Sequence, residues 1–314
     1  MAAAVGVLIP RDIAAGRFVE YVQRAEERGF QELWVVEDCC YRGGIAQAAV
    51  ALSFTRRVHV GIGILPAGVR NAVYAASEIA TLATLYPGRL SVGVGHGMPK
   101  WMRKVGETRQ SPMALLEETL QCIRDLLWGR RLSMQGRYVR LDDVGLQIVP
   151  ELPPPVLAGV RSPKSLRLSG RIADGTILAE PVTTRYVLSA RDAINSPSHT
   201  IVAYNLAAVH SDADVAYEQV RREVAQFGDR DWAPHLQPLD IGTRFLELRA
   251  RCRSQEEFAG RLPRDWLNAL GIVGTPEEGR TRLKELAAVG VNTSVLIPTG
   301  SDPLNDLAEL SVLL

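Results

Sequence analysis

Short apolar runs alternate along this chain with longer segments whose apolar residues recur every three to four positions. Each run ends in a glycine, a proline or an acidic residue, and a helical pattern then follows. The runs predict strands at residues 4–10, 32–38, 58–65, 89–95, 154–160, 174–180, 200–210 and 291–298. Strands that alternate with helices in this way are typical of a parallel sheet.

The predicted strands are almost entirely apolar, as expected when helices cover one face of a sheet and a barrel core fills the other. Several helical segments start at a cap residue followed by proline, a strong start signal: Ser111-Pro112, Ser162-Pro163 and Thr275-Pro276. About eight β/α units in 314 residues predict an α/β fold, a single (β/α)8 TIM barrel over 1–314. The alternative is a doubly wound open sheet, which needs fewer strands and a topological switch.

Two stretches interrupt this rhythm. Residues 130–153 have the pattern of a hairpin inserted before the fifth strand of the barrel. Residues 227–272 contain Trp232, Trp266, prolines and mixed charge, and they are too long for a plain loop before the eighth strand. We therefore expect this second insertion to be functional, as a lid-like segment.

Composition excludes several classes of function. The formal net charge of +1 gives no electrostatic reason to expect binding to nucleic acid or to an anionic membrane. The apolar runs are far shorter than the roughly 18 residues of a membrane span, and the apolar start reads as a first strand and not a signal peptide. The four cysteines form no C-x-x-C pair, so we expect reduced thiols, no metal site and a cytoplasmic protein.

The stretch LSVGVGHGMPKWM, residues 90–102, carries three closely spaced glycines around His96. A dinucleotide-binding fingerprint would need a glycine at position 98 and a helix that opens directly, whereas Met98 stands there and a good helical pattern begins only near Ser111. In a barrel, the loop after the fourth strand lies at the carboxyl-terminal face, where active sites form. Glycines in this loop would let the backbone approach a flat ligand.

Four segments together resemble the bacterial luciferase-like superfamily, which contains flavin-dependent monooxygenases and coenzyme F420-dependent oxidoreductases. The four segments occur along the chain in the same order as the motifs of that superfamily. The similarity covers most of the chain except about 181–268. The segments are VGIGILPAGVRNAVYAASEIATL, YPGRLSVGVGHG, PPPVLAGVRSPKSLRLSGRIADGTILAE and GTPEEGRTRLKELAAVGV. The branch that the chain resembles is that of the F420-dependent methylenetetrahydromethanopterin reductases.

The resemblance implies where a cofactor ring would lie. Members hold an isoalloxazine or deazaflavin ring at the carboxyl-terminal mouth of the barrel. In the F420-dependent branch a non-prolyl cis peptide in the third strand backs the ring, and the matching bond joins Gly63 and Ile64. Gly95 and Gly97 of the fourth-strand motif would then border the cofactor.

The resemblance also implies catalytic candidates. Where the F420-dependent branch often has Glu or Asp after the fourth strand, this chain has His96, and both residue types perform general acid–base catalysis. After the second strand the family usually has an acidic residue followed by histidine. Asp38 matches the acidic position and Cys39 replaces the histidine, which argues against dehydrogenation of alcohols or sugars. We expect Cys39 to be a small wall residue of the substrate pocket.

The fifth strand leads directly into a helix start that suits a phosphate. A helix N-terminus offers free N–H groups and the positive end of the helix dipole, and two basic side chains there would add charge. The candidate residues are Ala158, Gly159, Arg161, Ser162 and Lys164. Both FMN and F420 carry a phosphate on the ribityl arm, so this feature does not separate them. Trp101 and Glu180 are further candidates for the pocket wall.

These observations favour an oxidoreductase that transfers a hydride between F420 and an organic small molecule, most readily as a reductase. An FMN-dependent monooxygenase of the same fold is the alternative, and a non-catalytic barrel that binds a flavin or serves structurally is a third. Family members commonly pair through their second and third helices. The segments AQAAVALSFT and AVYAASEIATLATL are rich enough in alanine to permit such a homodimer.

Overall fold

The computed structural model describes residues 3–229 and 232–314. Within these residues, eight parallel strands close into a barrel in the order in which they follow along the chain, because the last strand pairs with the first. They are β1 (Ala4–Leu8), β2 (Glu32–Val35), β3 (His59–Pro66), β4 (Leu90–Gly95), β7 (Val156–Gly159), β8 (Gly175–Leu178), β9 (Thr200–Val209) and β11 (Thr293–Pro298). The predicted TIM barrel is confirmed, and the open-sheet alternative is wrong.

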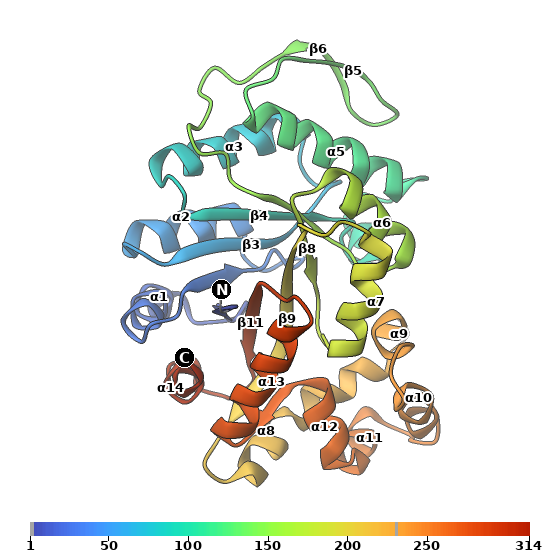
Figure 1. The fold of residues 1–314 in the computed structure, drawn as a ribbon. Helices are drawn as coiled ribbons and strands as arrows, with labels where there is room; N and C mark the ends of the chain where they lie inside the picture. Colours follow the sequence, from blue (N-terminus) through green and yellow to red (C-terminus); the bar gives the residue numbers. More distant parts are fainter. Residues whose placement is uncertain (1–2, 230–231) are drawn as a thin grey trace.

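Helices surround the barrel and link consecutive strands (Figure 1). They are α1 (Phe18–Glu27), α2 (Gly44–Phe54), α3 (Ala72–Leu85), α5 (Pro112–Leu127), α6 (Pro163–Ile172), α7 (Thr184–Ile194), α8 (Ala213–Ala225), α13 (Pro276–Ala288) and α14 (Pro303–Leu310), with short 3-10 turns η1 (Ala15–Arg17), η2 (Gln226–Gly228) and η4 (Ser311–Leu313). The side chains of Ser111, Ser162 and Thr275 each accept a backbone N–H of the following helix. The predicted helix starts are therefore confirmed.

The inside of the barrel is filled by large side chains that glycines of neighbouring strands accommodate. Trp34 and Tyr204 meet edge to face there, with their ring centroids 5.7 Å apart. A Cβ atom at Gly61 would collide with the Trp34 indole, so only glycine fits that position of β3. Close packing of this kind leaves the functional surface to the ends of the strands.

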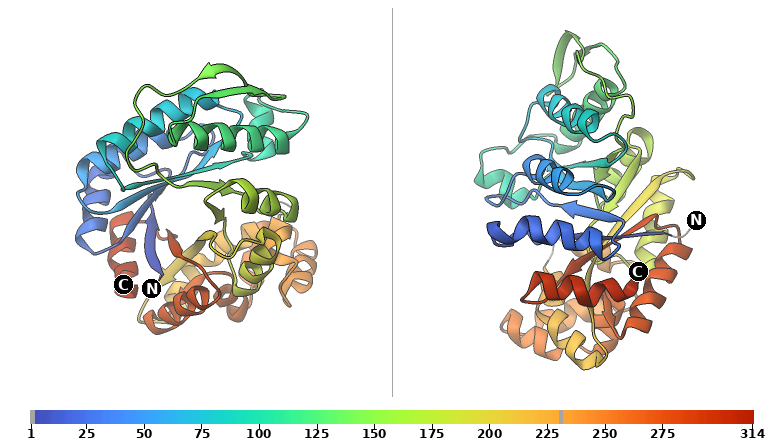
Figure 2. Two further views of the ribbon diagram at one scale, coloured as in Figure 1. Left: turned by 45° about the horizontal axis from the view of Figure 1, so that its top comes forward. Right: turned by 90° about the vertical axis from the view of Figure 1, so that its left-hand side faces the viewer.

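The two insertions fold differently. Residues 132–144 form an antiparallel pair, β5 (Leu132–Gln135) and β6 (Arg140–Val144), which lies over α3 and α5 (Figure 1). The second insertion contains α9 (Ala233–Leu236), α10 (Gly242–Ala250), α11 (Gln255–Arg261) and α12 (Arg264–Leu270). These helices lie beside α7 and α8, on the side of the barrel away from the hairpin (Figure 2). Residues 230 and 231 of the predicted 227–272 segment lie outside the described residues.

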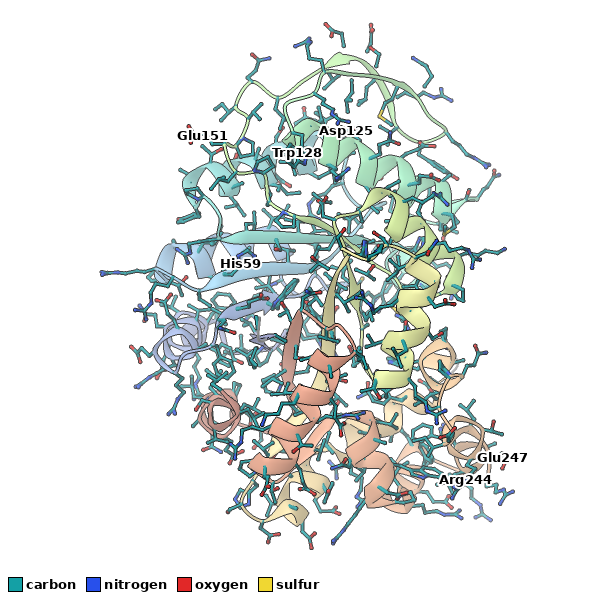
Figure 3. All side chains as sticks on the ribbon, in the orientation of Figure 1. His59, Asp125, Trp128, Glu151, Arg244 and Glu247 are labelled. Carbon is teal, nitrogen blue, oxygen red and sulfur yellow. The ribbon has the colours of Figure 1, made fainter. Side chains whose placement is uncertain are left out.

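The helical insertion has an apolar cluster of its own. Phe245 packs edge to face on Phe258 and lies 5.8 Å from Trp266, and α8 and the outer end of β9 complete the cluster. Charged residues such as Arg244 and Glu247 of α10 lie at its periphery. They are on the far side of the molecule from His59 at the start of β3 (Figure 3). The insertion is thus a compact packed unit.

Two short elements were missed by the hydrophobic pattern. A helix α4 (Pro99–Lys104) opens soon after β4, with Pro99 in its first turn, although we expected no helix before Ser111. A three-residue strand β10 (Ile272–Gly274) pairs in parallel with the outer end of β9. Both are too short to show a periodic pattern.

Candidate active site

The carboxyl ends of the strands bring the predicted residues to one end of the barrel. Asp38, His96, Arg161 and Glu180 follow β2, β4, β7 and β8, respectively. The charges of Arg161, Asp38 and Arg11 all act on the carboxyl group of Glu180, so these loops are near neighbours in space. This end of the barrel is called the mouth below.

A bulge in β3 forms the base of the mouth. The peptide bond between Gly63 and Ile64 is cis, as the family resemblance led us to expect. The register between β3 and β4 shifts between Ile62 and Leu65, so Ile64 is displaced from the regular ladder. Its side chain stays half-buried, whereas Ile62 and Leu65 are buried.

The glycines around this bulge make room for Ile64. A Cβ atom at Gly95 would lie 2.8 Å from Ile64 Cγ2 and 2.6 Å from the carbonyl oxygen of Gly159. A Cβ atom at Gly159 would collide with the end of the Ile64 side chain. We expected Gly95 to give clearance to a flat ligand directly, but a Cβ atom there would meet Ile64 and the backbone of Gly159. Gly97 adopts a positive φ of 70°, in the turn that leads to α4.

Behind the bulge lies a buried polar group. The hydroxyl group of Tyr204 lies so close to Gly63 that a Cβ atom there would collide with it. Among the described residues, neither this hydroxyl nor the amide nitrogen of Asn205 has a hydrogen-bond partner, although both are buried. Burial and the nearby charge of Glu180 raise the pKa of Tyr204, so it remains a neutral phenol.

His96 lies on the side of the mouth where α6 begins. Its Nε2 atom is 3.1 Å from the hydroxyl group of Ser165, which in turn lies 3.0 Å from the hydroxyl group of Ser162. Desolvation lowers the pKa of His96, so the imidazole is neutral at pH 7. Its Nδ1 atom is buried and has no hydrogen-bond partner among the residues that the structure describes.

The N-terminus of α6 has the features predicted for a phosphate site. Ser162 caps the helix, Pro163 occupies the first turn, and Ala158 is buried at the end of β7. Arg161 is half-buried and its guanidinium group contacts Met98 Sδ at 3.4 Å, whereas Lys164 is exposed. Of the two basic residues predicted here, Arg161 is thus the one that lies inside the site.

Asp38 belongs to the opposite side of the mouth. Its carboxylate accepts a hydrogen bond of 2.7 Å from the guanidinium group of Arg11, in the loop after β1. This bond raises the pKa of Arg11, which stays positively charged. Arg42 donates to the carbonyl oxygens of Arg11 and Ile13, which holds the β1 loop against the β2 loop.

Cys39 is half-buried beside Asp38 and its thiol lies 3.4 Å from that of Cys40. Both cysteines are free, and the contact with Cys40 raises the pKa of Cys39. A thiol with a raised pKa is a poor nucleophile. That Cys39 is a wall residue of the substrate pocket stays a prediction. Trp101, the other wall candidate, is half-buried on α4.

Glu180 is better placed than the sequence indicated. It follows β8 and precedes a cis peptide bond to Pro181. Desolvation raises the pKa of its carboxyl group to about 6, although part of the side chain remains exposed. The positive charge of Arg161 opposes this increase in the pKa, and the negative charge of Asp38 adds to it. A carboxyl group with such a pKa can exchange a proton near neutral pH.

The helical insertion also reaches this region, at residues that the sequence did not single out. His235 of α9 is fully buried, and its ring centroid lies 4.4 Å from that of Tyr186. Burial lowers the pKa of His235 to about 3, so it is neutral. Tyr186 donates a hydrogen bond of 3.2 Å to the carbonyl oxygen of Arg161, which links the insertion to the start of α6. This link between the insertion and the start of α6 depends on tertiary contacts, which the sequence pattern does not show.

Over residues 3–229 and 232–314, no group of three or more His, Cys, Asp or Glu side chains is arranged to hold a metal ion. None of the helices in this part of the chain is both long and apolar enough to cross a membrane.

Comparisons with known proteins agree with this geometry. The chain is 23% identical over 291 residues to the 5,10-methylenetetrahydromethanopterin reductase of Methanolobus tindarius, which covers 89% of each chain. It is 27% identical over 323 residues to the F420-dependent glucose-6-phosphate dehydrogenase of Amycolatopsis mediterranei, covering 96% of this chain and 92% of the relative. The structure of the coenzyme F420-dependent tetrahydromethanopterin reductase of Methanopyrus kandleri superposes with a TM-score of 0.84 at 21% identity, covering 99% of this chain and 98% of the other.

A family model described as luciferase-like monooxygenase matches residues 3–293, nearly the whole chain. The four motifs that carry the resemblance lie within that range, and three of them contribute residues to the mouth: the β3 bulge, the β4 glycines and the start of α6. The chain therefore belongs to the luciferase-like monooxygenase family.

Proposed function

We propose that the protein is an oxidoreductase that transfers a hydride between coenzyme F420 and an organic small molecule, acting as a reductase. The observation that carries this proposal is the displaced Ile64, which Gly95 and Gly159 accommodate at the base of the mouth. The Ile64 side chain would offer an apolar support for a flat ring, with His96 and Asp38 at the ends of neighbouring strands. The relatives whose names specify F420 match the chain over most of its length, which supports the same choice of cofactor.

The residues at the mouth fit such a cofactor. Ile64 would support the deazaflavin ring, and Gly95, Gly97, Ala158 and Gly159 would border it. The phosphate-bearing arm would bind at the start of α6, where Ser162, the free N–H groups of the first turn and the charge of Arg161 are available. When bound, F420 supplies a carbon centre that donates or accepts a hydride.

The chain's own residues would then handle the proton that accompanies hydride transfer. Glu180, with a pKa of about 6, is suited to hold a proton and donate it to the substrate. Asp38 is fixed by Arg11 and would orient the substrate or exchange the proton with Glu180. His96 is neutral and its Nε2 atom is bonded to Ser165, so it would position the first turn of α6 beside the cofactor.

The helical insertion would define the substrate. Its residue His235 packs on Tyr186, whose hydroxyl group binds the backbone of Arg161. The insertion is therefore coupled mechanically to the proposed phosphate site. A substrate above Ile64 would contact Cys39, Trp101 and Glu180 on its other sides.

The test is a pair of titrations of the purified protein with F420 and with FMN, followed by intrinsic tryptophan fluorescence. We expect micromolar binding of F420 and much weaker binding of FMN. Tight binding of FMN alone would favour the monooxygenase alternative, and binding of neither would favour a non-catalytic barrel. A His96→Gln variant with unchanged F420 affinity and turnover would remove His96 from the site.

We further propose a cytoplasmic homodimer. Val50 and Phe54 on α2 and Tyr74 on α3 are exposed apolar side chains on neighbouring helices, and pairing would remove them from water. Analytical ultracentrifugation should give a dimer for the wild type and a monomer for Tyr74→Glu. Trp128→Glu, which changes another exposed aromatic side chain, at the end of α5, should stay dimeric. Cell fractionation tests the location.

A further inference from the structure

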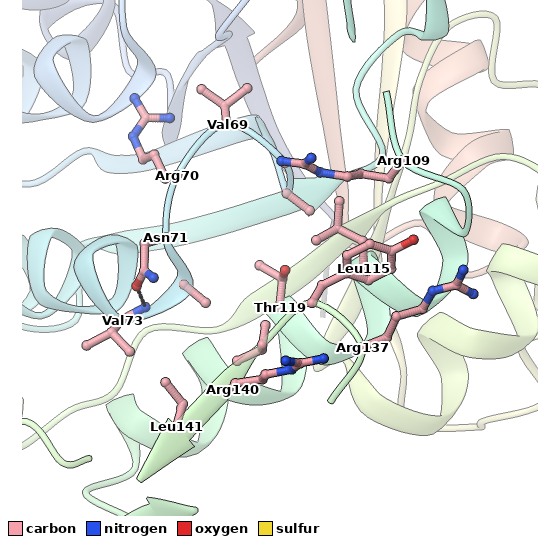
Figure 4. A pocket seen from close by; sticks show the side chains of 15 residues that line it. Val69, Arg70, Asn71, Val73, Arg109, Leu115, Thr119, Arg137, Arg140 and Leu141 are labelled. Carbon is pink, nitrogen blue, oxygen red and sulfur yellow. Dashed lines mark hydrogen bonds between the residues drawn. The ribbon is translucent and has the colours of Figure 1, made fainter. Parts of the chain in front are cut away.

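A pocket of about 510 Å³ lies beside the mouth, between the loop after β3, helix α5 and the β5–β6 hairpin (Figure 4). Its volume is in the range typical of small-molecule sites. Four arginines and no carboxylate line it. The arginines are Arg70, Arg109, Arg137 and Arg140, and the apolar side chains among the lining residues include Leu115, Val139 and Leu141.

The four guanidinium groups differ in their partners. Arg70 binds Glu37 in a two-bonded ion pair and Arg109 binds Glu107, so these two charges are largely compensated. Arg137 donates to the side-chain carbonyl oxygen of Gln110 and Arg140 to the backbone carbonyl oxygen of Gly136 at 3.4 Å. These acceptors are neutral.

One further carboxylate approaches the hairpin turn without lining the pocket. Glu118 of α5 accepts the backbone N–H groups of Arg137, Tyr138 and Val139. It holds the backbone of the hairpin turn against α5, and the charge of Arg137 acts on its carboxylate. Glu118 is not part of the lining, whose charged side chains are all arginines.

Other donors complete the lining. Helix α3, fourteen residues long, begins at the pocket, and its residues Ala72 and Val73 belong to the wall. Thr119, only 3% exposed, lies on the floor beside Leu115 (Figure 4). A helix N-terminus, guanidinium groups and a hydroxyl group are all groups that bind carboxylate or phosphate oxygens.

We propose that this arginine pocket is a second binding site, for a molecule or group that carries at least two carboxylate or phosphate anions. Two groups are specified because, among the described residues, the guanidinium group of neither Arg137 nor Arg140 donates a hydrogen bond to a carboxylate, and a single anion would leave one of these guanidinium groups without an ionic hydrogen bond. The site does not depend on the proposed redox activity. The anions can belong to a free small molecule or to the distal part of a ligand that also enters the mouth.

The experiment is isothermal titration calorimetry of the full chain with citrate and, separately, inorganic pyrophosphate, at low ionic strength. We expect one saturable site that weakens as salt is added, because the interaction is between charges. Arg137→Gln combined with Arg140→Gln should weaken binding at least about tenfold, since each lost charged hydrogen bond contributes about 1.5–3 kcal/mol. Arg131→Gln is the matched control, because Arg131 is on the same hairpin, outside the pocket, and binds Asp143.

Circular dichroism must first show that all variants are folded. Absence of saturable binding of either probe to the wild-type protein would overturn the proposal, as would equal weakening by Arg131→Gln. The F420 affinity of the double variant then distinguishes the two sources of the anion. An unchanged F420 affinity indicates a free molecule, and a parallel loss indicates that one ligand reaches both sites. Failure of F420 to bind at all would count against the proposed function only.

Discussion

The two sides of the mouth differ in the groups that they present. On the side of α6, His96, Ser165 and Ser162 form a chain of neutral groups that ends at a helix N-terminus. In the loops after β1, β2 and β8, which approach one another across the mouth, the Arg11–Asp38 ion pair lies near the carboxyl group of Glu180. The first side is equipped to hold an anion in place, and the second to move a proton.

This division separates binding from chemistry. Groups on the α6 side keep one protonation state near neutral pH, so they hold a ligand equally well over that range. Glu180 has a pKa of about 6 and changes its protonation state over the same range. Substitutions on the first side should therefore alter affinity, and those on the second should alter turnover and its pH dependence.

The largest effect should come from Glu180→Gln. General acid–base groups contribute about 10²–10⁴-fold to rate, so kcat should fall at least about a hundredfold while the dissociation constant of F420 changes little. In the wild type, turnover in the reducing direction should decline as the pH rises through about 6, because the carboxyl group then loses its proton. Steady-state kinetics across pH measure both effects.

Glu151→Gln is the control for this variant, because Glu151 is an exposed carboxylate near the end of α5, far from the mouth (Figure 3). A Glu180→Gln protein that keeps full turnover with an unchanged pH profile would show that the carboxyl group takes no part in proton transfer.

Gly159→Ala should have the next largest effect, on affinity. The added methyl group would collide with Ile64 and displace it towards the mouth, and overpacking of this kind costs about 1–3 kcal/mol. We expect F420 to bind about tenfold more weakly, as measured by fluorescence titration. Gly260→Ala on α11, where a methyl group meets open space, should bind normally.

Ser165→Ala should have a smaller effect on the same side. It removes the hydroxyl group between His96 and Ser162, and one neutral hydrogen bond contributes about 0.5–1.5 kcal/mol. F420 affinity should fall a few-fold and kcat should stay the same. If kcat fell more than affinity, the neutral chain would be part of the chemistry and the division between the two sides would not hold. Ser77→Ala on the exposed face of α3 serves as control.

The smallest effect concerns stability. The pKa of Glu180 is about 6 in the folded protein against an ordinary value of 4.5, so the folded state binds the proton more tightly than the unfolded state. The stabilisation that proton binding by Glu180 gives to the folded state is complete below about pH 4.5 and is lost as the pH rises through about 6. Glu180→Gln should thus be more stable than the wild type at pH 7, by about 1 kcal/mol once partial exposure is allowed for.

Urea unfolding at pH 7 and at pH 4 measures this difference, which should disappear at the lower pH. Equal stability of the two proteins at pH 7 would mean that the carboxyl group is well solvated in the folded state.

The contrast between the two sides also explains what could be predicted from sequence. The α6 side is local: a strand, a Ser-Pro helix start and nearby basic residues follow one another between residues 156 and 172, so a single segment predicts it. The Arg11–Asp38 pair joins two loops 27 residues apart, and no pattern indicates which arginine would meet Asp38. The pKa of Glu180 depends on side chains from several loops.

The eight strands could be predicted for the same physical reason as the α6 side, because each is a continuous apolar run. Strand β10 and helix α4 could not, since they form through pairing with β9 and through the turn after β4. His235 is a buried, neutral histidine in a segment without strong periodicity, and only its packing on Tyr186 makes it notable.

The separate apolar cluster of the helical insertion has a consequence for how such proteins diversify. Phe245, Phe258 and Trp266 pack on one another and on α8, while the barrel interior is filled by Trp34 and Tyr204. The two interiors are distinct clusters that meet at Ile297. Substitutions within the helical insertion can therefore change its shape while the packing of Trp34 and Tyr204 inside the barrel is kept.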